Sequence, residues 1–200
     1  MTYGPDSAEA ALRDCLARGA HQAVNVTGGE KTLGDSFTIA KVLAGVVKDK
    51  EFDLVLCGVK GVGTDCAQVG QMLAELLDIP HVAAITELEV ADGSLTAGRD
   101  VEGGKEKVES PLPALLTCQK GLNEPRYAAL KGIMAAKRKP VDKVEVGSLG
   151  VEEGADPFYQ VEKFELPPEK AAGTIIQGED DAAAAAAELV KLLREEAKAI

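Results

Sequence analysis

Residues 52–58 form the stretch that most restricts the possible fold. Their near-continuous apolar run, Phe-Asp-Leu-Val-Leu-Cys-Gly, has the length and composition of a strand buried on both faces. A glycine-rich loop at 59–64, a helical pattern at 65–77 and another apolar strand at 82–85 follow it. This order of strand, loop, helix and strand is typical of a parallel sheet whose strands are joined by helices.

The flanking segments extend this pattern into an α/β domain. The spacing of apolar residues predicts helices at 7–19 and 35–48 and short strands at 23–26 and 114–118. Beyond residue 86, apolar and polar residues alternate around Asp92-Gly93 and Gly103-Gly104, which are typical hairpin turns. The sequence therefore predicts an α/β fold with a doubly wound, mainly parallel sheet and an antiparallel extension.

The C-terminal part of the chain has a different character. Residues 144–173 show no periodicity and contain three prolines, and so long an irregular segment is unusual inside a compact domain. An alanine-rich helix follows at 179–200. We therefore expect one domain at 1–143 and, at 144–200, an arm ending in a helix that packs on another subunit.

The composition restricts the possible partners. Hydrophobic residues make up 46% of the chain and aromatic residues only 4%, with no Trp, so the core must be aliphatic. The formal net charge of -11 argues against nonspecific binding to nucleic acid or to an anionic membrane. No apolar stretch is long enough to span a bilayer and no signal peptide is recognisable, so we expect a bacterial cytoplasmic protein.

The sequence contains no set of residues typical of a catalytic or metal site. The four cysteines are far apart and form no CxxC pair, which favours reduced core thiols over disulfides or a zinc site. His21 and His81 flank apolar strands and are expected at strand edges rather than as bases or metal ligands. The sequence therefore predicts a binding protein, without metal, rather than an enzyme acting alone.

The loop after the buried strand is the first candidate site. In open α/β sheets, ligands bind beside the carboxyl ends of the strands, and glycines allow the backbone to approach a phosphate. The spacing matches neither GxGxxG nor a P-loop, so an ordinary turn with Asp65 as the cap of the next helix is the competing interpretation. The residues are Gly58, Val59, Lys60, Gly61, Val62, Gly63, Thr64 and Asp65.

A basic cluster is the second candidate site. It surrounds three apolar residues at helical spacing, Leu130, Ile133 and Met134. Such a patch in an acidic chain indicates a docking surface for an acidic partner, although a solvated helix face with cations near its C-terminus is the alternative. The cluster comprises Arg126, Lys131, Lys137, Arg138, Lys139 and Lys143.

Several longer strings are more specific than either motif. They are Arg99-Asp-Val-Glu-Gly-Gly-Lys-Glu-Lys-Val-Glu109, Leu112-Pro-Ala-Leu-Leu-Thr117, Leu122-Asn-Glu-Pro-Arg-Tyr127 and Gly132-Ile-Met-Ala-Ala-Lys-Arg-Lys139. In this order they resemble the electron transfer flavoprotein β subunit, and the likeness runs from Tyr3 to the C-terminal helix. The resemblance implies a Rossmann-like, adenine-nucleotide-binding domain. It also implies an αβ heterodimer that carries electrons from flavin dehydrogenases, such as the acyl-CoA dehydrogenases of fatty acid β-oxidation, to a membrane quinone oxidoreductase.

The resemblance also implies cofactors and contacts. FAD would be held mainly by the α subunit, and this chain would hold a structural AMP, or a second FAD as in electron-bifurcating members. The AMP contacts match Tyr3 and the loop from Gly58 onwards, extended by Cys66, Ala67, Gln68 and Val69. Arg99 and Asp100 match the contact with the α subunit near the flavin, where Asp100 stands in place of the usual Glu.

The dehydrogenase-binding loop of that family matches residues 123–139, with Leu130 as its anchor. The matching residues are Asn123, Glu124, Pro125, Arg126, Tyr127, Leu130, Gly132, Ile133, Met134, Lys137, Arg138 and Lys139. The family's first strand has no counterpart here, and Gly63-Thr-Asp-Cys66 lacks the acidic run common in AMP-binding members. AMP is still expected rather than a second FAD. The alternatives are an electron-bifurcating subunit and a stand-alone adenine-nucleotide-binding module.

Overall fold

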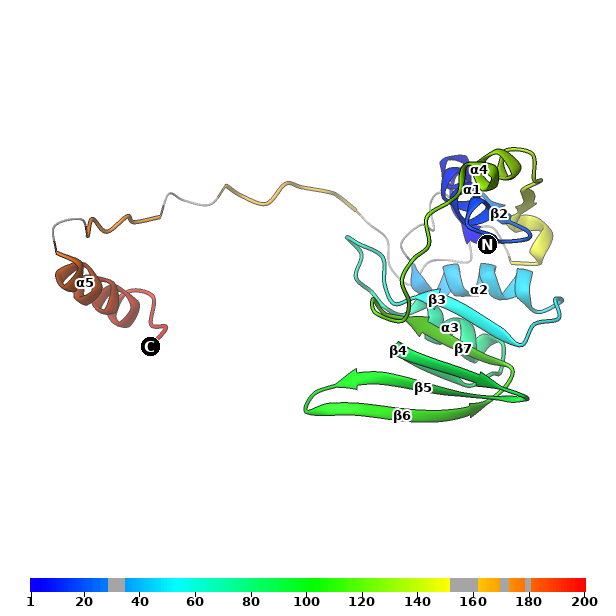
Figure 1. The fold of residues 1–200 in the computed structure, drawn as a ribbon. Coiled ribbons are helices and arrows are strands. Elements are labelled where there is room, and N and C mark those ends of the chain that lie inside the picture. Colours follow the sequence, from blue (N-terminus) through cyan, green and yellow to red (C-terminus); the bar gives the residue numbers. More distant parts are fainter. Residues whose placement is uncertain (29–34, 152–161, 170–172, 179–180) are drawn as a thin grey trace. The chain divides into compact units, whose positions relative to one another are not determined.

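The computed structural model describes residues 1–28, 35–151, 162–169, 173–178 and 181–200 (Figure 1). The chain divides into two compact units, Met1–Glu162 and Lys163–Ile200. The first unit contains, in chain order, β1 (Thr2–Tyr3), η1 (Asp6–Ala8), α1 (Glu9–Ala17), β2 (Val24–Thr27), α2 (Ser36–Val47), β3 (Leu54–Gly58), α3 (Val69–Leu76), β4 (His81–Ala91), β5 (Ser94–Val101), β6 (Gly104–Pro111), β7 (Ala114–Cys118), α4 (Leu130–Ala136), β8 (Asp142–Glu145) and η3 (Val146–Leu149).

The strands of the first unit form two sheets. The smaller one, β1-β2-β8, is entirely parallel. The larger one has the order β3-β7-β4-β5-β6, in which the first three strands are parallel and the last two antiparallel (Figure 1). The predicted α/β fold with a parallel sheet and an antiparallel extension is confirmed. Within the described residues, however, β1 pairs only with β2 and β3 only with β7, so the strands do not join into one sheet.

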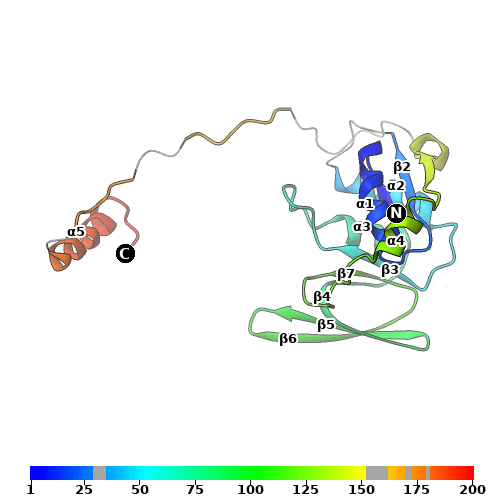
Figure 2. The same ribbon diagram turned by 45° about the horizontal axis from the view of Figure 1, so that its top comes forward.

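Helices cover both faces of the smaller sheet. On one face, valines of β2 and α2 pack with Val146 of η3. On the other face, leucines of α1 pack with Ala23, just before β2, and with Ala136 of α4. Figure 2 shows α1 and α4 side by side near β2. The Asp35 side chain caps α2 by accepting a hydrogen bond of 3.0 Å from the Thr38 amide, which explains why the helix begins there.

The larger sheet packs against α3 through very close contacts. A Cβ added at Gly70 would lie 2.6 Å from Cγ2 of Thr117 in β7, so only glycine permits this approach. Thr117 itself is buried, and its Oγ1 accepts a 2.8 Å hydrogen bond from the amide of Ala84. Ala84 has a left-handed φ of 56° at an irregularity in the pairing of β4 with β7. The threonine hydroxyl therefore satisfies an amide at a point where the regular ladder is interrupted.

Several predicted elements are confirmed and others were wrong. The helices expected at 7–19 and 35–48 and the strands at 23–26, 52–58 and 114–118 are present within one or two residues at most boundaries. Residues 82–85 and 88–90 were expected to form separate strands but lie in one strand, β4, which changes partners through its irregularities. Residues 144–149 were expected to be irregular but form the end of β8 and η3, because β8 pairs in parallel with β2.

The second unit contains α5 (Ala182–Glu195), which confirms the predicted C-terminal helix. The Asp181 side chain accepts hydrogen bonds of 3.0 Å from the amides of Ala183 and Ala184 and so caps the helix. Much of the expected arm, namely 152–161 and 170–172, lies outside the described residues. In the described part of the chain, no helix combines the length and hydrophobicity that crossing a bilayer requires.

Candidate functional site

Residues 58–69, here called the glycine loop, connect the carboxyl end of β3 to the first turn of α3. Every member is exposed or half-buried, and Val62 is fully exposed. The loop turns back on itself because the Asp65 amide donates a 3.0 Å hydrogen bond to the Gly61 carbonyl. Gly63 has a φ of 102°, which a residue with a side chain rarely adopts. The loop is therefore accessible to a ligand at the end of a parallel strand.

The helix after the glycine loop begins later than the sequence indicated. A helix from about residue 65 was expected, with an Asp65 cap as the competing interpretation of the loop. In the structure α3 begins at Val69 after Gln68, which makes no side-chain capping bond. Asp65 and Ala67 have φ values of 50° and 51°, and left-handed residues cannot belong to a right-handed helix. The interpretation of Asp65 as an ordinary helix cap was therefore wrong.

The charge of Lys60 is already paired within the loop. Its Nζ lies 3.2 Å from Oδ1 of Asp65, and both side chains are more than half exposed. An exposed pair of this kind contributes only about 0–1 kcal/mol, so an incoming anion could take over the lysine at little cost. The remaining loop groups that can bind an anion are backbone amides, the Thr64 hydroxyl and the Gln68 side-chain amide. Such groups at the end of a parallel strand are of the kind that bind phosphate.

Tyr3 lies in β1. Its ring packs partly against the valine cluster formed by β2 and α2. Two residues of β1 pair with Asn25 and Val26 of β2, so the position is held by a parallel ladder. The structure thus places Tyr3 at the carboxyl end of a strand, as it does the glycine loop, but in the other sheet.

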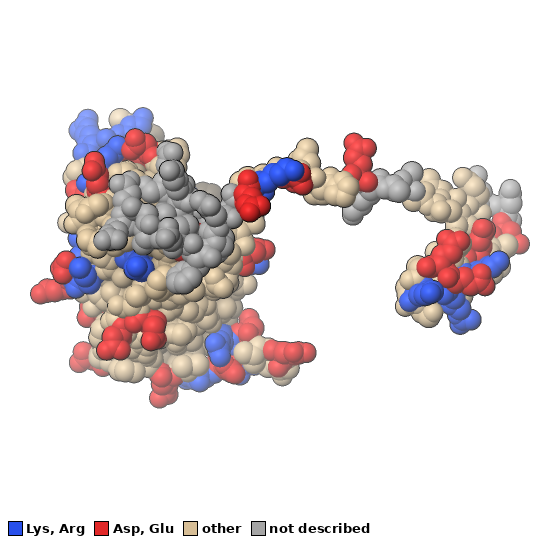
Figure 3. Space-filling model, turned by 180° about the vertical axis from the view of Figure 1, so that it is seen from behind, with Lys and Arg blue, Asp and Glu red and all other residues tan. Residues whose placement is uncertain are grey.

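Residues 123–139, here called the docking segment, present a different surface. Residues 123–129 have no regular structure, and of the expected helical turns only α4 forms. Tyr127 and Leu130 are 93% and 77% exposed, and Met134 is 51% exposed, so these large apolar side chains are not core residues. Lys and Arg side chains gather at the end of the unit that carries α1 and α4 (Figure 3).

The cations of the predicted basic cluster have different environments. Lys139 donates a 2.6 Å hydrogen bond to the Ala20 carbonyl, and Lys143 lies 2.8 Å from Asp6, which raises the pKa of the lysine. Within the described residues, Lys131, Lys137 and Arg138 form no ion pair. These three are exposed and flank the apolar side chains of α4. The cluster thus divides into two structural lysines, three available cations beside α4, and Arg126, which is also exposed.

Two arginines of α1, Arg13 and Arg18, hold the docking segment, and the sequence analysis missed both. Arg18 donates to the Arg126 carbonyl at 2.6 Å, and Arg13 donates to the Ala136 carbonyl at 2.7 Å. Each arginine also pairs with an acid one turn earlier in α1, at Glu9 and Asp14. These acid–arginine pairs four residues apart are visible in the sequence and are the signal that could have drawn attention to α1.

Arg99 and Asp100 lie in β5 on the antiparallel ribbon. Arg99 Nη2 is 2.6 Å from Glu106 of β6, and Lys105 of β6 lies between Asp100, at 3.8 Å, and Glu87. The bond to Lys105 lowers the pKa of Glu87 and raises that of the lysine. All these groups are at least one-third exposed, so the ladder of charges remains open to a partner.

The cysteines are free, but two are not core thiols as had been expected. Cys15 and Cys66 are exposed, since Cys66 belongs to the glycine loop and Cys15 to the outer face of α1. Burial raises the pKa of Cys57 and of Cys118, which lie on adjacent strands. Within the described residues, no group of three or more His, Cys, Asp and Glu side chains is placed to hold a metal ion.

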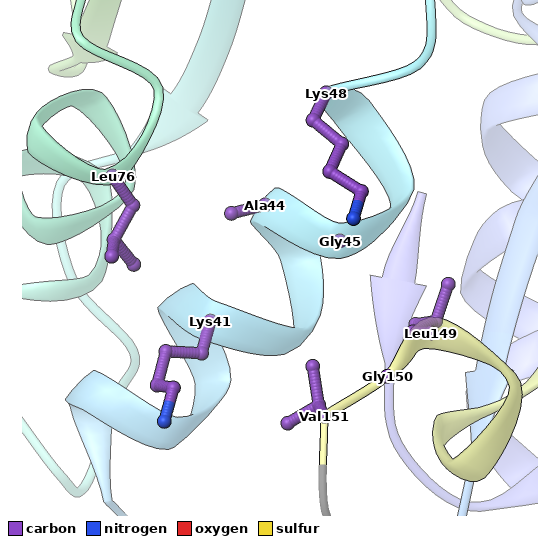
Figure 4. A pocket seen from close by; sticks show the side chains of 8 residues that line it. All are labelled: Lys41, Ala44, Gly45, Lys48, Leu76, Leu149, Gly150 and Val151. Carbon is purple, nitrogen blue, oxygen red and sulfur yellow. The ribbon is translucent and has the colours of Figure 1, made fainter.

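A cavity of about 510 Å³ lies between α2, α3 and the residues that follow η3. In Figure 4 the side chains of Lys41 and Lys48 extend from α2 on either side of Ala44 and Gly45, and Leu149 and Val151 face them. No residue of the glycine loop lines this cavity. The cavity is therefore separate from both candidate sites of the sequence analysis.

Fold and site together define an α/β protein built on parallel strands, with an exposed glycine loop at one strand end and an apolar, basic surface on α4. A family model described as "Electron transfer flavoprotein domain" matches residues 1–149. The chain is 47% identical over 203 residues to the electron transfer flavoprotein subunit beta of Bacillus subtilis, covering 100% of this chain and 78% of that protein.

Other relatives are named in related ways. The chain is 37% identical to the "Caffeyl-CoA reductase-Etf complex subunit CarD" of Acetobacterium woodii, over 89% of this chain and 70% of that protein. It is 33% identical to the electron transfer flavoprotein subunit beta of Homo sapiens, over 96% of this chain and 75% of that protein. The chain therefore belongs to the electron transfer flavoprotein family and is similar to its β subunits.

Proposed function

We propose that this chain is the β half of a cytoplasmic αβ electron carrier, which relays electrons from flavin dehydrogenases, such as acyl-CoA dehydrogenases, to a quinone oxidoreductase. Family membership carries the proposal, and the exposed Leu130 between available cations supports it. The redox FAD would be held mainly by the α subunit. The role left to this chain is positioning and docking, which requires no acid or base of its own.

The glycine loop is the proposed AMP site, with Tyr3 as a further contact. The strand-end position, the left-handed Gly63 and the weakly held Lys60 support phosphate binding there. Arg99 and Asp100 would face the α subunit near the flavin, and residues 144–200 would pack on that subunit. In the structure described above, Asp100 and most of the glycine loop are exposed, and Tyr3 and Arg99 are half-buried.

Nucleotide analysis of the assembled complex tests this assignment. The chain is coexpressed with an electron transfer flavoprotein α subunit, the complex is purified, and released nucleotides are quantified. One FAD and one AMP per heterodimer are expected. Two FAD would identify an electron-bifurcating subunit. Adenine nucleotide bound by this chain without a flavoprotein partner would indicate a stand-alone module.

Leu130→Ala tests the docking assignment. Truncating a central, exposed apolar anchor typically costs at least about 1.4 kcal/mol of binding, or about tenfold in affinity. We expect the KM for the dehydrogenase to rise about tenfold while flavin content stays the same. Val90→Ala is the matched control, because Val90 is another exposed aliphatic residue and lies on the antiparallel ribbon. Equal KM values for both variants and the parent would contradict the docking role.

A further inference from the structure

The docking segment has little structure of its own to keep its apolar side chains in place. Residues 123–129 are irregular, and α4 has only seven residues with no side-chain cap at its start. Isolated helices this short are not stable in water, so α4 depends on tertiary contacts. Its one buried residue is Ala136. The apolar side chains of Tyr127, Leu130 and Met134 point away from the core and cannot supply those contacts.

The contacts come instead from α1 and the residue that follows it, and two arginines there supply the polar ones. Arg18 Nη1 donates to the Arg126 carbonyl at 2.6 Å, immediately before Tyr127. Arg13 Nη1 donates to the carbonyls of Ala136, at 2.7 Å, and Lys139, at 3.2 Å, at the other end of α4. The two arginines therefore attach the docking segment on both sides of its exposed anchor, across more than 100 residues of sequence.

Each guanidinium is itself held by a carboxylate four residues earlier on α1. Arg18 Nε lies 2.9 Å from Asp14, and Arg13 lies 2.7 Å from Glu9. An arginine has a rigid planar set of five donors, so one part can bind the acid while another binds a backbone carbonyl. The acid thus restricts the rotamers of the arginine before any partner binds. The carbonyls at the end of α4 also lack helical partners, which makes them good acceptors for a cation.

We propose that Arg13 and Arg18 are positioning residues that hold the docking segment in its binding conformation from behind, without touching the partner. The inference rests on the proposed docking function of residues 123–139 and adds the reason why that surface is ordered before binding. Ordering a loop during association weakens affinity, and an already ordered loop avoids that loss. Release of either arginine therefore weakens docking although Leu130 and the available cations are all retained.

The test uses the assembled αβ complex carrying Arg18→Ala, Arg18→Lys or the control Lys48→Ala. Lys48→Ala removes one exposed cation from the end of α2 and leaves α1 intact. Hydrogen exchange of residues 123–136 is expected to become about tenfold faster in Arg18→Ala, with no change in the control. Arg18→Lys keeps the charge but cannot bind acid and carbonyl with one planar group, so an intermediate increase is expected. Unchanged hydrogen exchange in Arg18→Ala would overturn the proposal, whether or not residues 123–139 bind a dehydrogenase.

Kinetics with a purified acyl-CoA dehydrogenase distinguish positioning from a general loss of stability. Arg18→Ala is expected to raise the KM about fivefold with kcat retained, and this effect should fall below twofold in a Leu130→Ala background. Additive effects of the two changes would overturn the idea that Arg18 acts through the placement of Leu130. A rise in KM for Leu130→Ala but not for Arg18→Ala would overturn it too, while leaving the docking function intact. If neither Leu130→Ala nor Arg18→Ala changes the KM, the docking function itself is refuted, and with it the role of Arg18 in docking.

Discussion

Replacing Gly132 by alanine is expected to destabilise this protein, although the same change stabilises most helices. A Cβ built at Gly132 lies 2.4 Å from the carbonyl oxygen of Ala17, at the end of α1. The nearest atom belongs to the backbone, so no side-chain rotation can relieve the contact. Restoring an ordinary van der Waals distance requires α4 to move away from α1 by about 1 Å.

The expected magnitude follows from two opposing effects. Overpacking of this kind costs about 1–3 kcal/mol, and a shift of α4 also weakens hydrogen bonds that contribute about 1 kcal/mol each, such as that from Arg18 to the Arg126 carbonyl. Alanine's better helix propensity offsets about 1 kcal/mol. The net loss is about 1–3 kcal/mol, which for a unit of this size lowers Tm by about 3–9 °C.

Thermal and urea unfolding of the purified protein measure this change. Gly147→Ala is the matched control, because a Cβ at Gly147 meets no atom within 4 Å and its backbone is not left-handed. The control should remain within about 0.5 kcal/mol of the parent. A Gly132→Ala protein as stable as the parent, or more so, would refute the conclusion that α1 and α4 touch through their backbones at this point.

Three further outcomes follow from the packing and from the pKa shifts. Thr117→Val keeps the shape but removes the acceptor of the half-buried Ala84 amide, so urea unfolding should show a loss of about 0.5–1.5 kcal/mol, and a neutral result would contradict that bond. Asp35→Ala removes the cap of α2 and should cost about 0.5–2 kcal/mol in the same assay, unlike Asp35→Asn, which retains an acceptor. Burial raises the pKa of Cys57 and Cys118, so these two thiols form less thiolate at pH 8 than exposed ones do. An alkylating reagent should therefore modify them more slowly than the other two cysteines, as followed by mass spectrometry, and uniform rates would argue against their burial.

The strand and helix pattern could be predicted because it depends on local chemistry. The apolar run of β3, the hairpin turns of the ribbon and the cap at Asp35 are each signalled by neighbouring residues in the chain. The start of α3 could not be predicted, since Asp65 and Ala67 adopt left-handed conformations that glycine usually provides. Such conformations are imposed by the surrounding loop, and no residue type at those positions indicates them.

The residue ranges of the candidate sites could be predicted, but the contacts between their side chains could not. Composition and resemblance pointed to the glycine loop and to residues 123–139, but the pairing of Lys60 with Asp65 depends on how the loop folds back. The attachment of the docking segment to α1 was invisible because the partners of Arg18 are a nearby acid and a carbonyl 108 residues away. Backbone acceptors are present at every position and leave no trace in a sequence.

The open side of β3 has a consequence for how the chain behaves in solution. Among the described strands β3 has one neighbour, β7, so a row of its amides and carbonyls has no partner strand, and its Leu56 side chain is 56% exposed. The opposite border of that sheet, β6, alternates lysines with glutamates, and such charges discourage pairing with another molecule. Leu-Val-Leu-Cys-Gly offers no such deterrent. Self-association that increases with protein concentration is therefore expected along β3, and a lysine in place of Leu56 should raise the solubility of the isolated chain.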